Sequence, residues 1–203
     1  MSSKICTQTH YTDRTFKGIR LERDQIVSSE FYDCTFIHCS FAESVFRNCR
    51  FANCTFQQCD SSLIQVPNST FSITRFENSK VIGVDWTRAD WSATRLGGPI
   101  GFFKCAISHS TFIGLSLRGI QIKDCIAAGV DFREADLSQA DFTGTDLSKS
   151  LFSKTNLTKA DLSGARNYHI TPGRNVIKQA KFSLPEAMSL LYSLDIVLTE
   201  EET

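Results

Sequence analysis

The stretch "FYDCTFIHCSFAESVFRNCRFANCTFQQC", from Phe31 to Cys59, contains six phenylalanines and five cysteines. Its phenylalanines recur at every fifth residue. A β-strand alternates with a period of two, and an α-helix repeats near 3.6 residues, so neither element alone explains a period of five. The pattern indicates an internal repeat whose unit is five residues long.

The same count extends over most of the chain. We call the large apolar residue of each unit its centre. Centres recur every five residues from Phe16 to Leu96, with Ser61 as the polar exception, and again from Phe102 to Phe182 after the phase moves by one residue. Fifteen of the sixteen phenylalanines are centres, and Phe103 is the other one. The repeat therefore covers about 160 residues, because each of its two phases spans some 80 of them.

A small residue stands two positions before most centres. Seven of the eight cysteines occupy this position, and Ser, Ala or Thr occupies it at most of the other centres. The small and the large residue then point the same way, with one outward residue between them. This alternation is that of a short strand, and a turn must reset it every five residues.

Composition limits the possible functions. The chain has 203 residues, a formal net charge of zero and a pI near 6.9, so it lacks the overall basic charge of a nucleic-acid-binding protein. We find no apolar run long enough to span a membrane and no secretion signal, and we expect a cytoplasmic protein. Eight cysteines in a reducing compartment favour free thiols over disulfides.

The segment "EADLSQADFTGTDLSKSLFSKTNLTKADLSGA" (134–165) resembles the A(D/N)LXX motif of the pentapeptide repeat proteins. The resemblance implies an all-β fold, a right-handed quadrilateral β-helix with four units per coil. Residues twenty apart, such as Phe36 and Phe56, should then stack about 4.8 Å apart along the axis. We expect this β-helix to cover residues 1–182, with a rod of roughly 40 Å.

The phase changes at "GGPIG" (97–101). Glycine permits unusual backbone angles and proline removes a hydrogen-bond donor, so the chain can absorb the change there. One interpretation is a projecting loop or bulge that contacts a partner. The favoured one is a tolerated one-residue insertion at a corner, too short for a long loop. Residues Gly97, Gly98, Pro99 and Gly101 are candidates for partner binding.

The last segment, residues 183–203, has a different character. Ser183 and Glu186 have the spacing of a capping box, and Pro185 suits the first turn of a helix over residues 184–194, with a short strand after it. Such an element should cap the open end of the sheet column. A plain cap and a dimerising cap are both possible, and similarity to dimeric pentapeptide proteins favours the homodimer. The candidate interface consists of Ala187, Leu190, Leu191, Leu194, Ile196 and Leu198.

We expect no enzyme, metal or cofactor. The cysteine spacing is imposed by the repeat, and an active site needs unlike groups that converge in a pocket, whereas a packed column offers none. Aspartates recur directly before centres and should form an outward array. They are either a partner-binding stripe or the ordinary motif residue; the candidates are Asp136, Asp141, Asp146 and Asp161.

Four segments resemble the albicidin-resistance type of pentapeptide protein, which is Qnr-like and protects DNA gyrase: "SSLIQVP" (61–67), "GVDWTRADW" (83–91), "NYHI" (167–170) and "AKFSLPEAMSLLYSLDIVL" (180–198). The resemblance implies a homodimer that mimics duplex DNA and binds DNA gyrase. By binding gyrase it would counter gyrase poisons. Topoisomerase IV is a second candidate partner. No direct binding of nucleic acid or membrane is expected. A scaffold or adaptor without topoisomerase binding is the alternative. Up to residue 182 the chain has 22 basic and 17 acidic residues, which does not favour strong mimicry of DNA.

Overall fold

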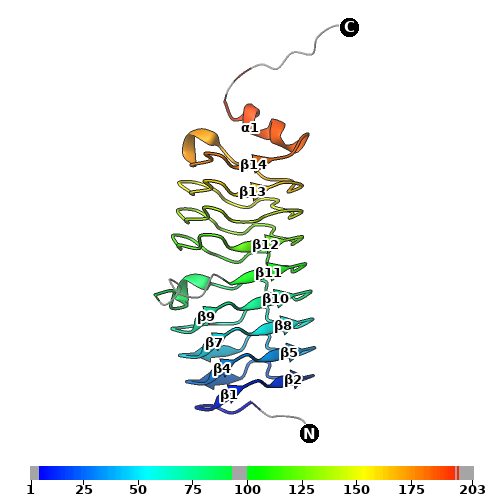
Figure 1. The fold of residues 1–203 in the computed structure, drawn as a ribbon, viewed down its shortest axis with the longest axis vertical. Coiled ribbons are helices and arrows are strands. Elements are labelled where there is room, and N and C mark those ends of the chain that lie inside the picture. The colour runs from blue at the N-terminus through cyan, green and yellow to red at the C-terminus, as the bar shows by residue number, and fades with distance from the viewer. Residues whose placement is uncertain (1–4, 93–99, 195, 197–203) are drawn as a thin grey trace.

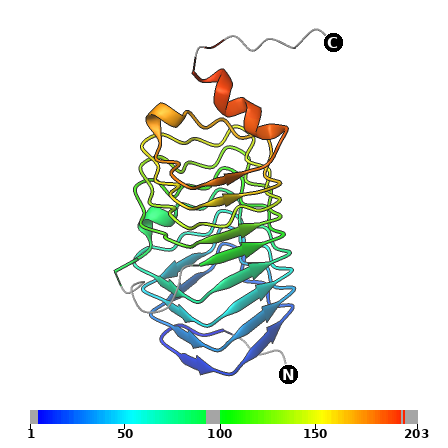
Figure 2. The same cartoon turned by 45° about the horizontal axis from the view of Figure 1, so that its top comes forward.

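The chain winds into a four-sided column of stacked coils, about eight turns long (Figure 1). The computed structural model describes residues 5–92, 100–194 and 196. Short parallel strands lie one above another along the faces, and the view in Figure 2 looks obliquely along the column. The expected quadrilateral β-helix is therefore confirmed. No helix among the described residues is both long and apolar enough to cross a membrane.

We number the faces in chain order. The first centre of face 1 is Phe16, that of face 2 is Leu21, and that of face 3 is Ile26. The first centre of face 4 is Tyr11, and Phe31 lies above it in the next coil. The strands are β1 (His10–Thr12), β2 (Thr15–Lys17), β3 (Gln25–Val27), β4 (Glu30–Tyr32), β5 (Thr35–Ile37), β6 (Val45–Arg47), β7 (Arg50–Ala52), β8 (Thr55–Gln57), β9 (Thr70–Ser72), β10 (Arg75–Glu77), β11 (Gly101–Phe103), β12 (Gln121–Lys123), β13 (Asp161–Leu162) and β14 (Lys181–Phe182).

Aromatic ladders fill the column. On face 1, β2, β5, β8 and β10 pair in parallel and stack Phe16, Phe36, Phe56 and Phe76, with centroids 5.1, 4.5 and 4.6 Å apart. All four rings are at most 3% exposed. The sequence count began at Phe16, but the face 4 ladder begins one unit before it, at Tyr11, which pairs with Phe31. Stacking at a spacing of twenty residues is therefore confirmed.

The corners use two kinds of turn. In a closed turn the carbonyl of the centre accepts a hydrogen bond from the backbone N–H three residues later, as from Ala140 to Leu137 at 3.0 Å. In an open turn this bond is absent, and a side chain from the next coil bridges the two groups. Ser79 Oγ accepts from the Cys59 N–H at 2.9 Å and donates to the Phe56 carbonyl at 3.1 Å.

This bridge explains why Ser, Thr or Cys stands two positions before many of the centres. Thr145 bridges Cys125 N and Ile122 O, and Cys125 Sγ bridges Cys105 N and Phe102 O. Above closed turns the same position holds residues that cannot bridge, such as Ala140, Ala160 and Ile170. A buried backbone group needs a partner, so the position selects small donors above open turns.

The phase change is longer than the sequence suggested. Phe76 pairs with Phe102 of β11, so this coil has 26 residues where the others have twenty. An insertion of six residues shifts the repeat by one, which is why the count showed a single extra residue. Leu96, the next centre after Trp91 by the sequence count, lies outside the described residues. A 3₁₀ turn, η1 (Trp86–Arg88), precedes the insertion on face 3.

The C-terminal helix is shorter than expected. It consists of η4 (Glu186–Met188) and α1 (Ser189–Tyr192), against the expected residues 184–194. The capping box does not form, because Ser183 Oγ accepts from Gly164 N–H and the Glu186 carboxylate accepts from Asn167 N–H. Both side chains tie the cap to the coil below. A further 3₁₀ turn, η3 (Pro172–Arg174), lies at a corner of the last coil.

Candidate protein-interaction surface

The interior offers no room for chemistry among the described residues. Phe, Leu, Ile and Cys side chains fill it, and no group of three or more His, Cys, Asp or Glu residues could hold a metal ion there. Burial raises the pKa of the Cys54 thiol to about 12, and it also raises the pKa of Cys34 and of Cys49. Any functional surface in this part of the chain must therefore lie outside the column, at the three outward positions of each unit.

The candidate aspartates lie on different faces. A step of five residues moves the chain to the next face, so Asp136, Asp141 and Asp146 occupy faces 4, 1 and 2. Asp141 and Asp161 stack on face 1, because their spacing is twenty. The structure therefore brings two of the four candidates together and does not arrange the set as one stripe.

Each of these carboxylates caps its own turn. Oδ1 of Asp136, Asp141, Asp146 and Asp161 accepts a hydrogen bond of 3.0 Å from the backbone N–H two residues later. An Asp or Asn side chain readily makes this local bond and favours turns for that reason. Asn156 makes the same bond to Thr158 N–H, which explains why the motif accepts both residue types.

Basic neighbours neutralise most of these aspartates. Lys123 approaches Asp141 at 2.9 Å, Arg166 approaches Asp146 at 3.4 Å, and Lys181 approaches Asp161 at 3.0 Å. Hydrogen bonds from Ser163, reinforced by Lys181, hold the pKa of Asp161 at about 2. Because Asp141, Asp146 and Asp161 are each paired with a cation, these three carboxylates add little net negative charge to the surface.

The glycine-rich candidates fall mostly outside the described residues, since Gly97, Gly98 and Pro99 lie in the undescribed segment 93–99. Gly101 is buried in β11, and its N–H donates to Thr74 O at 2.9 Å. A Cβ atom at Gly101 would lie 2.9 Å from the Phe103 ring, and Arg75 covers that ring at 4.2 Å from its centroid. Gly101 thus has a packing role.

The candidate dimer residues differ in exposure. Ala187, Leu190 and Leu191 are half-buried, and Leu190 packs against the core. Leu194 and Ile196 are exposed, and Leu198 lies outside the described residues. Sequence reasoning did not single out the two most exposed apolar side chains of this end, Leu184 and Tyr192. The described part of the cap therefore presents apolar groups to solvent.

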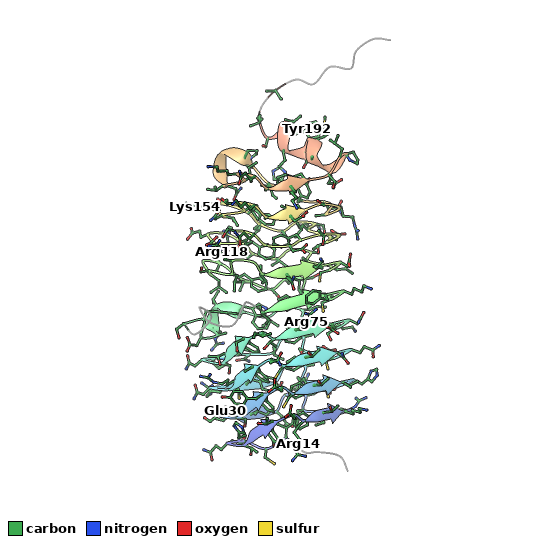
Figure 3. The ribbon with its side chains drawn as sticks, in the orientation of Figure 1. Arg14, Glu30, Arg75, Arg118, Lys154 and Tyr192 are labelled. Carbon is green, nitrogen blue, oxygen red and sulfur yellow. The ribbon has the colours of Figure 1, made fainter. Side chains whose placement is uncertain are left out.

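Sequence reasoning also missed a cluster of cations on the C-terminal part of face 4 and its corners. Figure 3 shows Arg118 and Lys154 on the same side of the upper column. The cluster consists of Arg118, Lys154, Lys159, Arg174 and Lys178, all exposed. Comparing outward residues that are twenty apart would have found this cluster, because its members occupy the same few positions in stacked coils.

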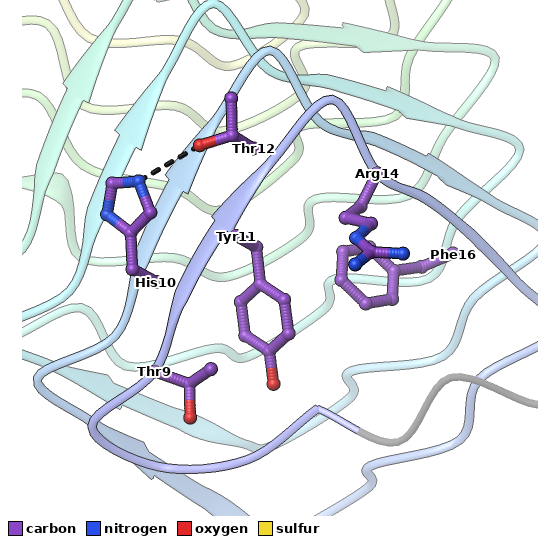
Figure 4. Close-up of a pocket in the computed structure, with 6 residues that line it drawn as sticks. All are labelled: Thr9, His10, Tyr11, Thr12, Arg14 and Phe16. Atoms are coloured by element: carbon purple, nitrogen blue, oxygen red, sulfur yellow. Dashed lines mark hydrogen bonds between the residues drawn. The ribbon is translucent and has the colours of Figure 1, made fainter.

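A hollow of about 560 Å³ lies at the N-terminal end (Figure 4). Tyr11, Arg14 and Phe16 line it, and His10 Nε2 lies 2.9 Å from Thr12 Oγ1 at its rim. Arg14 stands at the position that holds Cys34 and Cys54 in later coils, and it is exposed here. The hollow is the open end of the column, and its groups do not form a catalytic arrangement.

Comparisons with known proteins agree with this geometry. The family described as "Pentapeptide repeat region" matches residues 29–99, and "Pentapeptide repeats (8 copies)" matches 116–153 and 135–166. No match was found among curated proteins.

Two solved structures share the fold. One is a trypsin-treated variant of QnrB1, a plasmid-mediated fluoroquinolone resistance protein, with 20% identity, a TM-score of 0.55, and coverage of 95% of this chain and 100% of that one. The other is HetL of the cyanobacterium Nostoc, which is involved in the regulation of heterocyst differentiation, with 14% identity, a TM-score of 0.54, and coverage of 87% and 86%. Together with the family matches, the stacked five-residue units show that this chain belongs to the pentapeptide repeat family.

Proposed function

We propose that this protein binds a type II topoisomerase, DNA gyrase, and protects it against poisons that act on its DNA-cleavage complex. The observation that supports this most is a filled column without an internal site among the described residues, which can act on a partner only through its outer surface. The fold shared with QnrB1, a fluoroquinolone resistance protein, favours gyrase as the partner. Topoisomerase IV, a related enzyme, is a second target within the same proposal.

Binding, rather than turnover, fits the described surface. The motif aspartates Asp136, Asp141, Asp146 and Asp161 are each committed to a turn. In the part of the chain that the structure describes, no group of three or more His, Cys, Asp or Glu side chains could hold a metal ion. Catalysis requires unlike groups that converge in a pocket. Action in the cytoplasm, where gyrase works, is part of this proposal.

We further propose a homodimer formed through the C-terminal cap. Leu184, Tyr192, Leu194 and Ile196 are 76, 69, 49 and 48% exposed on the described part of this end. A twofold axis there would bury these apolar side chains against their copies and double the length of the rod. Light scattering at micromolar concentration should give twice the chain mass of 22.7 kDa. A monomer mass would reject the dimer.

A scaffold or adaptor function is the second candidate, because HetL, a protein involved in regulating differentiation, matches with a nearly equal TM-score. The two candidates make opposite predictions for purified gyrase. We expect the protein either to inhibit supercoiling or to reduce cleavage stabilised by a quinolone or albicidin. No effect on supercoiling or on cleavage, at protein concentrations well above that of gyrase, would favour the adaptor.

The cap offers a matched pair of variants for this assay. Tyr192→Ser removes exposed apolar surface from the proposed interface, whereas Ile73→Ser removes a similarly exposed side chain from face 4, far from the cap. If the dimer is needed, Tyr192→Ser should weaken protection of gyrase and Ile73→Ser should not. Equal effects of both variants would mean that the cap has no special role.

A further inference from the structure

The C-terminal part of face 4 carries more positive charge than its own carboxylates balance. We call the five residues named above, Arg118, Lys154, Lys159, Arg174 and Lys178, the basic cluster. Lys154 and Arg174 occupy the corner between faces 3 and 4, and the Lys154 N–H donates to the Arg174 carbonyl at 2.7 Å. Lys159 N–H donates to the Lys178 carbonyl at 2.9 Å, so the other side of the face repeats this arrangement.

The acidic groups nearby do not neutralise the cluster. Among described residues, Lys154 has a carboxylate within 4.0 Å, that of Glu134 at 3.6 Å, and the other four cations have none. Asp136 uses Oδ1 to accept from Ser138 N–H and Asn156 Nδ2. By contrast, on face 1 of the same coils Lys123 and Lys181 are each paired with an aspartate.

A shallow hollow lies between two of the cations. It has a volume of about 330 Å³ and lies between Arg118 on one side and Lys159 on the other. Ser138 and Thr158, twenty residues apart, stack in it, and Gln139 lies beside them, bonded to Arg118 Nε through its oxygen at 3.4 Å. Hydroxyl and amide donors beside two cations form a polar recess that suits an oxygen anion.

We propose that this face binds an acidic polypeptide segment, with one carboxylate seated in the hollow and others against Lys154, Arg174 and Lys178. Stacked coils repeat about every 4.8 Å, so the cations form a row along the column against which an extended acidic chain can lie. Asp136 also lines the hollow, and its charge disfavours a doubly charged phosphate more than a single carboxylate. No aromatic side chain among the described residues lines the hollow to stack on a nucleic-acid base.

The test measures binding of a fluorescein-labelled peptide of twelve glutamates by anisotropy at about 0.1 M salt, where the Debye length is about 10 Å and distant charges are screened. The test variant is Arg118→Gln/Lys159→Gln/Lys178→Gln. The control is Arg47→Gln/Lys80→Gln/Lys104→Gln, which removes the same charge from exposed cations on faces 3, 2 and 1. We expect the test variant to weaken binding at least about tenfold and the control less than about twofold, because exposed cations act over roughly a Debye length.

A third variant probes the hollow itself. Asp136→Asn keeps a side chain that can cap the turn, as Asn156 does, and removes the opposing charge. It should tighten peptide binding a few-fold. Circular dichroism checks that every variant is folded. Equal loss in the test and control variants would overturn the proposal, and so would a twelve-base-pair duplex DNA that binds more tightly than the peptide and responds to the same substitutions. The test needs no gyrase, so its outcome is independent of the function proposed above.

Discussion

The bridging side chains can be tested by replacing Thr145 with valine. Thr145 is fully buried, and its hydroxyl donates to Ile122 O at 2.6 Å and accepts from Cys125 N–H at 3.2 Å. Valine has nearly the same shape, so Thr145→Val removes the bridge without opening a cavity. The Ile122 carbonyl and the Cys125 amide then lose this partner inside the column.

The expected cost follows from these two groups. Each buried polar group left without a partner costs about 1–3 kcal/mol, so the loss of two partners should lower the free energy of unfolding by about 2–6 kcal/mol. For a chain of this size the melting temperature should fall by about 4–24 °C. Thr145→Ser keeps the hydroxyl and should recover most of the loss.

Urea unfolding followed by both circular dichroism and tryptophan fluorescence is the suitable assay, because repeat proteins can unfold in parts. Thr70→Val, at an outward position of β9, is the matched control and should change stability by less than about 0.5 kcal/mol. The reasoning fails if Thr145→Val is as stable as the parent protein, or if Thr145→Ser is as damaging as Thr145→Val.

Three further predictions concern the column. Phe51 lies between Phe31 and Phe71, with centroids 4.9 and 5.0 Å away, and Phe51→Ala should cost about 3–5 kcal/mol; an unchanged denaturation midpoint would contradict the stacking register. The pKa of Asp161 is lowered to about 2, so its stabilisation is present above a pH of about 4 and is lost as the pH falls from about 4 to 2. Asp161→Asn should remove that part of the acid dependence, at most about 1 kcal/mol because the pair with Lys181 is exposed to solvent; an unaltered stability profile between about pH 2 and 5 would argue against it. Gly144 has φ of +69°, and a Cβ atom there would clash with the Asp124 carboxylate, so Gly144→Ala should cost about 1–2 kcal/mol in thermal unfolding, whereas Gly114→Ala, with open space around it, should cost less.

The period of five was sufficient to predict the coils, because every centre must reach the same interior. It predicted that Phe36 and Phe56 stack, and it placed seven of the eight cysteines inward. Size alone seemed to explain the residue two positions before each centre. The bridge from Ser79 to two backbone groups of the coil below was not foreseen, because it depends on which turns are open.

The insertion and the candidate site were harder to predict for a simple reason. An insertion of six residues and one of a single residue shift a period of five equally, so counting could not separate them. The aspartates seemed to form a row because they are regular in sequence, yet each step of five turns the chain by one face. Surface neighbours are twenty residues apart, and the basic cluster emerges only when that spacing is applied.

The ion pairs also limit how far the column can imitate DNA. Duplex DNA carries about one negative charge per 1.7 Å, so a rod of about 40 Å would need about 24 of them. Residues 1–182 carry 17 acidic and 22 basic side chains, and several of these aspartates are paired with cations. A partner that recognises this column must therefore read its shape and local patches more than a uniform negative field. We accordingly expect the proposed binding to gyrase to weaken only a few-fold between about 50 and 200 mM salt. A loss of about a thousandfold or more, as for proteins that make many contacts to DNA phosphates, would show that charge mimicry dominates after all.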